Sequence, residues 1–63
     1  MKKRYQVFTR IWNVSPDIAL KKGDVVEIVD RDEHEVCVSN TYFNGYSYWV
    51  RIDDFNIHCE PLN

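Results

Sequence analysis

A turn leads directly into an apolar strand in the stretch Lys22-Gly23-Asp24-Val25-Val26-Glu27-Ile28-Val29. Gly23 has no Cβ atom and so tolerates the positive φ angle that a tight turn requires. The strand is expected over Val25 to Asp30, because its side chains alternate between two faces. The same alternation of short strands and turns continues on both sides of this stretch.

Towards the N-terminus, the pattern predicts a first strand and a long loop. Residues 4–12 alternate, with Tyr5, Val7 and Ile11 on one face and Phe8 and Trp12 on the other. Residues 13–20 contain Ser-Pro-Asp at positions 15–17, where proline fixes φ and aspartate bonds to nearby backbone amides. We therefore expect a long loop between the first strand and the Gly23 turn.

Towards the C-terminus, the pattern predicts a hairpin, a helical turn and a last strand. A third strand begins at Val36 and continues towards Phe43, and its partner runs over residues 46–52. Asn44-Gly45 between them is a strong hairpin signal, because both positions of a type I′ turn need a positive φ. Residues 53–56 have the composition of one helical turn, and residues 57–60 form a last strand before Pro61.

Length and composition predict one small all-β domain. The 63 residues are enough for a single core and too few for two. No segment keeps the apolar period of an amphipathic helix, whereas aromatic residues, Val and Ile are abundant. We expect one domain over residues 1–63, without a secretory signal or a membrane span, and therefore a cytoplasmic location.

The order of these motifs resembles the Src-homology 3 (SH3) fold and its bacterial relatives. The Lys-Gly-Asp turn at 22–24 is similar to the diverging turn of that family, and Glu60-Pro61-Leu62 is similar to its last strand. The resemblance implies a five-stranded SH3-like barrel with a long first loop and one short helical turn before the last strand. An OB-like or other small barrel is the alternative.

SH3 domains that bind proline-rich peptides use an aromatic groove, and the sequence has only part of it. The Tyr-rich motif of the first loop is replaced by Trp12-Asn13-Val14, and the Trp of the third strand by Val36-Cys37. In the helical turn, Asp53 stands in place of proline. Recognition of proline-rich peptides is therefore not expected.

The aromatic residues exceed what one small barrel encloses, and they indicate a surface for a protein partner. Alternation puts Trp49 opposite to Val50 on its strand, and exposed Trp and Tyr side chains are frequent interface anchors. Acidic loops would add selectivity for a basic partner. The candidate residues are Trp12, Tyr42, Tyr46, Tyr48, Trp49, Asp32, Glu33 and Asp53. In the simpler interpretation, the rings only pair across strands and shield the hairpin.

Metal binding and catalysis are not expected. His34 with Cys37, and His58 beside Cys59, depart from the usual zinc-site spacing. His58 and Cys59 are adjacent on the expected last strand, so they point to opposite faces and could not both reach one ion. The acidic run at 30–35 lacks the residues of a calcium loop. We predict no cofactor, reduced and buried cysteines, and no enzyme activity.

The favoured hypothesis is a small regulatory or inhibitory factor, of the kind that phages and bacteria encode as single SH3-like domains. A nucleic-acid-binding barrel is an alternative, although the formal net charge of −2 does not favour contact with phosphates. Its basic residues would be Lys2, Lys3, Arg4, Lys21, Lys22 and Arg51. The protein is expected to be a monomer, or a homodimer that buries the rings of the hairpin or a sheet edge.

Overall fold

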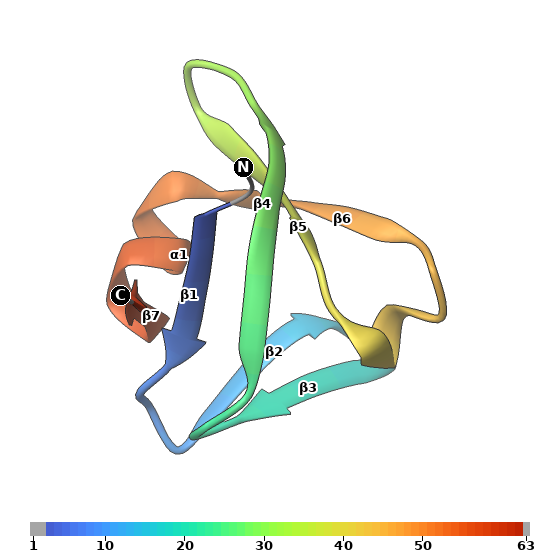
Figure 1. The fold of residues 1–63 in the computed structure, drawn as a ribbon, viewed down its shortest axis with the longest axis vertical. Coiled ribbons are helices and arrows are strands. Elements are labelled where there is room, and N and C mark those ends of the chain that lie inside the picture. Colours follow the sequence, from blue (N-terminus) through green and yellow to red (C-terminus); the bar gives the residue numbers. More distant parts are fainter. Residues whose placement is uncertain (1–2, 63) are drawn as a thin grey trace.

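The chain folds into short strands with one 3-10 turn and one short helix (Figure 1). The computed structural model describes residues 3–62. Its elements are β1 Lys3–Val7, β2 Ile11–Ser15, β3 Ile18–Lys21, β4 Val25–Arg31, β5 Glu35–Ser39, the 3-10 turn Thr41–Phe43, β6 Ser47–Arg51, α1 Ile52–His58 and β7 Cys59–Pro61. The predicted all-β class is confirmed, but the described chain has seven strands rather than five.

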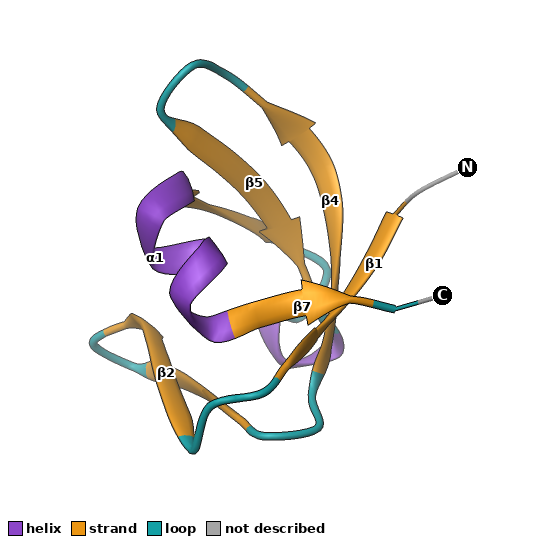
Figure 2. Cartoon of the chain, turned by 90° about the vertical axis from the view of Figure 1, so that its left-hand side faces the viewer, coloured by secondary structure: helices purple, strands orange, loops and turns teal. Residues whose placement is uncertain are grey.

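Five of these strands form one antiparallel sheet in the order β6-β5-β4-β1-β7. The predicted closed barrel is wrong, because the edge strands β6 and β7 are not paired with each other. Helix α1 connects these two edges and runs directly into β7 (Figure 2). The sheet therefore stays open, and a helix rather than a ladder of hydrogen bonds spans the gap.

The two additional strands lie where we predicted a long loop. β2 and β3 pair as a hairpin, in which Trp12 is opposite Leu20. Both side chains are buried, so the hairpin is held by its own ladder and by the core. Ser15-Pro16-Asp17 forms the turn of this hairpin. These turn-forming residues led us to predict a loop over the whole segment, including the short strands on either side. The predicted strand over residues 4–12 is accordingly two strands, separated at residues 8–10.

The core lies between the inner face of the main sheet, the β2–β3 hairpin and α1. It contains Val7, Trp12, Leu20, Val26, Val36, Val38, Phe43, Val50, Phe55 and Cys59. The aromatic rings interlock: Tyr5 meets Phe55 edge to face with 4.9 Å between centroids, and Trp12 meets Phe55 at 6.1 Å. Trp12 also stacks on His58 at 5.4 Å. These contacts join the hairpin to the helix.

The connection between β5 and β6 is longer than the predicted two-residue turn. The strands end at Ser39 and resume at Ser47, and the 3-10 turn lies between them. The Asn40 side chain caps that turn by accepting a hydrogen bond from the Tyr42 amide, and the Phe43 ring is buried. Asn44 and Gly45 have the predicted positive φ values of 54° and 84°. Their conformations are confirmed, whereas the tight hairpin is not.

The C-terminal segment is more helical than predicted. The expected turn over 53–56 is the seven-residue helix α1, and the last strand is Cys59–Pro61 rather than residues 57–60. Asp53 and Asp54 lie in the first helical turn, as expected for acidic side chains near a helix N-terminus. Phe55 lies in the middle of α1, and its buried ring anchors the helix to the core. Within the described residues, α1 is far too short to cross a membrane.

Candidate functional site

The face of the main sheet that points away from the core carries polar side chains and one large aromatic ring. Val36 and Val38 of β5 point into the core, so Cys37 between them points to this outer face. Its cross-strand neighbour on β6 is Trp49, which is 46% exposed. Cys37 is only 6% exposed, which we attribute to cover from the neighbouring Trp49 ring.

Three of the five predicted aromatic site residues are exposed on the β5–β6 hairpin. Tyr42 is 65% exposed and Tyr46 is 69% exposed, and both lie in the connection that leads to the strand of Trp49. Tyr48 is half-buried, because its ring packs edge to face against Phe43 with 4.8 Å between centroids. The exposed aromatic residues of this hairpin are therefore Tyr42, Tyr46 and Trp49, and Phe8, which follows β1, is also exposed.

The prediction that Trp12 joins this surface is wrong. Its side chain is only 3% exposed and belongs to the core. Trp12 lies on β2, and the pairing of β2 with β3 turns its ring towards α1 rather than towards solvent. The strand pattern separated Trp12 from its neighbours but did not indicate which face the core would take.

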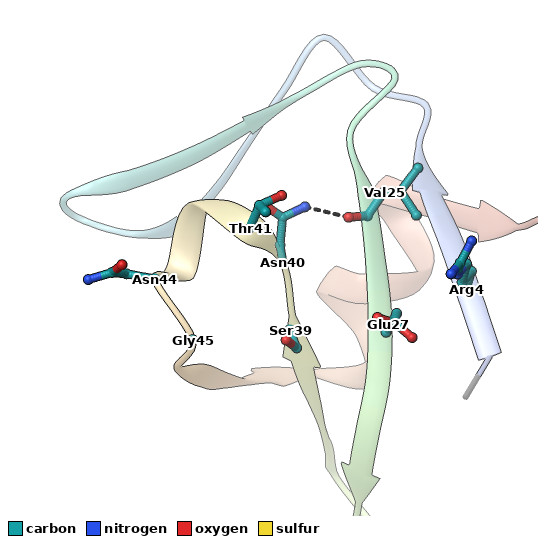
Figure 3. A pocket seen from close by; sticks show the side chains of 8 residues that line it. All are labelled: Arg4, Val25, Glu27, Ser39, Asn40, Thr41, Asn44 and Gly45. Atoms are coloured by element: carbon teal, nitrogen blue, oxygen red, sulfur yellow. Dashed lines mark hydrogen bonds between the residues drawn. The ribbon is translucent and has the colours of Figure 1, made fainter. Parts of the chain in front are cut away.

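A polar hollow of about 500 Å³ opens beside the β5–β6 connection (Figure 3). Arg4 and Glu27 are cross-strand partners in its wall, and the Asn40 side chain donates a hydrogen bond to the Val25 carbonyl. The lining residues are Arg4, Val25, Glu27, Ser39, Asn40, Thr41, Asn44 and Gly45. The sequence did not indicate that these residues lie together, because the register of β1, β4 and β5 brings the strand residues among them side by side.

The acidic candidate residues meet at the other end of the hairpin. The β4–β5 turn and the start of α1 enclose a second hollow of about 520 Å³. Four carboxylates and one guanidinium line it, together with His34 and Ile52; the charged residues are Asp32, Glu33, Glu35, Asp53 and Arg51. The predicted acidic residues are thus brought together, at the Arg51 end of β6. The hollow carries a net negative charge that favours a basic ligand group.

Asp32 organises this turn through its carboxylate. Its Oδ1 atom accepts hydrogen bonds from the amides of His34 and Glu35, at 2.8 and 2.7 Å. The hydrogen bond from the His34 amide contributes most to lowering the pKa of Asp32 below its ordinary value of 3.8, and the bond from the Glu35 amide contributes next. Both bonds favour the ionised carboxylate. The carboxylate therefore holds the turn most firmly when it is charged.

We expect Asp32→Ala to lower the midpoint of chemical unfolding at neutral pH. Because the folded-state pKa is lowered, the stabilisation by Asp32 is complete above the unfolded pKa and is lost as pH falls through the folded one. The difference between the wild type and Asp32→Ala should therefore become smaller in acid. Asp32→Asn is the matched control, since it keeps the oxygen acceptor but does not titrate. Denaturant titrations at several pH values measure the unfolding midpoint of each variant. A difference between the wild type and Asp32→Ala that stays the same in acid would contradict this role of the charged carboxylate.

The cysteine thiols are buried, as predicted. Cys37 and Cys59 are free thiols, and burial raises the pKa of Cys59 to about 12, so this thiol stays protonated near neutral pH. His58 lies next to Cys59 in sequence, but its Nδ1 atom is 2.9 Å from the Thr9 hydroxyl oxygen. Among residues 3–62, no three His, Cys, Asp or Glu side chains are grouped so as to hold a metal ion.

The described basic candidates are distributed over three strands and a turn, and Lys2 lies outside the residues that the structure describes. Arg4 lies on β1, Lys21 and Lys22 lie at the end of β3 and in the following turn, and Arg51 lies on the edge strand β6. Arg4 faces Glu27, and Arg51 faces Glu35 across the strands. Nothing in this arrangement favours the nucleic-acid alternative, which needs a continuous basic track beside the exposed rings.

Comparison of the chain with protein-family models, curated proteins and solved structures finds no match. The candidate site therefore rests on the geometry of the chain itself.

Proposed function

We propose that this chain is a non-catalytic protein-interaction module that binds its partner through Tyr42, Tyr46 and Trp49. The observation that carries the proposal is their exposure: these three aromatic residues of one hairpin are 65%, 69% and 46% exposed. Aromatic side chains supply large contact areas and few rotatable bonds, so they dominate many interfaces. The acidic hollow at the other end of β6 adds selectivity for a basic partner.

We further propose that the module is SH3-like and acts as a small regulatory or inhibitory factor in the cytoplasm. Support comes from the five strands of the main sheet, which occupy the positions expected from the resemblance, and from β1, which lies beside β7. The turn at Gly23 has the positive φ expected of the diverging turn, at 100°. The hairpin β2–β3 takes the place of the long first loop.

The test is capture of binding partners by the purified protein from the source cells. We expect Tyr42→Ala/Tyr46→Ala/Trp49→Ala to lose the partner, because truncating a few central anchors commonly costs 2 kcal/mol or more each, roughly thirtyfold in affinity. Circular dichroism and thermal unfolding must show that the variant remains folded. Tyr5→Phe, a change at a half-buried ring of the core, is the control that should retain the partner. Equal capture by the wild type and the triple variant would refute the proposal.

A further inference from the structure

The two edges of the main sheet differ in how open they are to further pairing. β7 has only three residues and ends in Pro61, whose nitrogen carries no hydrogen to donate. β6 comprises Ser47, Tyr48, Trp49, Val50 and Arg51, with neither proline nor glycine. Natural proteins protect sheet edges with very short strands, prolines, bulges or charged side chains, and of these β6 has only the charge of Arg51 at its end.

The backbone groups that β6 directs outward follow from its register with β5. The Ile52 amide donates to the His34 carbonyl at 3.0 Å, so these two residues form a hydrogen-bonded pair that extends the β5–β6 register. Such pairs alternate with non-bonded pairs in an antiparallel ladder. Trp49 and Ser47 therefore belong to non-bonded pairs, and their N–H and C=O groups point away from β5, towards the open edge.

The distribution of charge along β6 favours one orientation of an added strand. The acidic hollow lies at the Arg51 end of β6, whereas Tyr46 immediately precedes its Ser47 end. A strand added antiparallel to β6 would begin beside the carboxylates and end beside the aromatic connection. Antiparallel addition is the more stable arrangement per residue. Basic residues at the beginning of that strand would lie near Asp53, which follows the Arg51 end of β6 and lines the hollow.

We propose that β6 accepts an extended segment of the partner protein as an additional antiparallel strand. The segment carries Lys or Arg at its N-terminal end, followed by β-branched residues that pack beside Trp49. Its main chain bonds to Ser47 and Trp49, and its basic side chains lie against the acidic hollow. This inference rests on the proposed function, and it specifies the chemistry of the partner.

The probe is the peptide Arg-Lys-Val-Thr-Val-Thr-Val, blocked at both ends, added to the labelled full chain. We expect amide hydrogen exchange at Ser47 and Trp49 to slow when the peptide binds, because their outward N–H groups become donors to it. The same residues in reverse order form the control peptide, which should bind about tenfold more weakly, the equivalent of losing one charge-assisted contact. Binding of the first peptide should weaken as salt is added.

Substitutions at Ser47 and Asp53 test strand addition without changing the three exposed rings. Ser47→Pro removes one outward donor while no bond to β5 is lost, and we expect it to weaken peptide binding by about tenfold. Ser47→Ala is the matched control and should bind as the wild type does. Asp53→Lys should reduce the preference for the forward peptide over the reversed one. Thermal unfolding of each variant verifies that the fold is kept.

The outcomes distinguish this inference from the proposed function. If the cellular partner is captured through the three rings but Ser47→Pro captures it equally well, strand addition is wrong and the interaction module stands. If the triple aromatic variant also captures it, both are wrong. Unchanged exchange at Ser47 and Trp49 with saturating peptide overturns the inference. The two amides could also become protected without peptide as the protein concentration rises, while sedimentation shows dimers forming over the same range. That result would assign the edge to a second copy of the chain and would also overturn the inference.

Discussion

Trp12→Ala is expected to destabilise this protein more than any other substitution that we propose. Truncation of a buried tryptophan to alanine typically costs about 3–5 kcal/mol, from lost apolar contact and from the cavity left behind. A domain of 63 residues has a total free energy of unfolding of about 3–9 kcal/mol. The substitution therefore removes at least about a third of the free energy of unfolding, and all of it if the wild type is near the lower end of that range.

The contacts of Trp12 explain why its truncation should destabilise several elements at once. Its ring stacks on His58 and meets Phe55 edge to face, and its strand partner Leu20 is fully buried. Without it, the β2–β3 hairpin loses its main contact with α1. Amide NMR spectra and urea unfolding measure the effect. Trp49→Ala is the matched control, and it should change the free energy of unfolding by much less, because that ring is half exposed. Similar losses for the two tryptophans would contradict the packing described here.

Phe55→Ala is expected to have the second-largest effect, again about 3–5 kcal/mol. Phe55 is the buried residue of α1, the element that spans the gap between β6 and β7. Its ring contacts Tyr5 on β1 and Trp12 on β2. Removing it detaches the helix from both the sheet and the hairpin, so we expect α1 and β7 to become the least protected parts of the chain.

Ile57→Ala provides the comparison on the same helix. Ile57 is 59% exposed, so its truncation should change the free energy of unfolding by only about 0.5 kcal/mol or less, and alanine favours helix slightly more. Chemical unfolding and hydrogen exchange of α1 in the two variants measure the contrast. A loss in Ile57→Ala as large as that in Phe55→Ala would show that α1 packs through a different face.

The hairpin of β5 and β6 shows which parts of the candidate site could be predicted. Strand alternation correctly put Val50 towards the core and Trp49 on the opposite face, because successive side chains point to opposite sides. It did not predict that Tyr42 would lie in a 3-10 turn. That turn forms because the Phe43 ring packs into the core and the Asn40 side chain accepts a hydrogen bond from the Tyr42 amide. The burial of Phe43 depends on neighbouring elements.

The acidic residues illustrate the same limit. Asp32 and Glu33 were expected at a polar turn and Asp53 at a helical turn, and each lies there. Their proximity to each other and to Arg51 depends on the pairing of β5 with β6, which joins segments about twenty residues apart. Likewise, the wall formed by Arg4 and Glu27 exists only through the pairing of β1 with β4.

By itself, the sequence determined the all-β class, the turn at Gly23, the positive φ angles of Asn44 and Gly45, and the opposite orientation of Trp49 and Val50. These features depend on local geometry: the missing Cβ of glycine, the tolerance of asparagine for the left-handed region, and the two-residue period of a strand. Tertiary structure alone decided that Trp12 is buried, that the main sheet stays open with α1 connecting its two edge strands, and that β6 is one of those edges. Alternation defines two faces for every strand, and only packing against distant segments selects which of them the core takes.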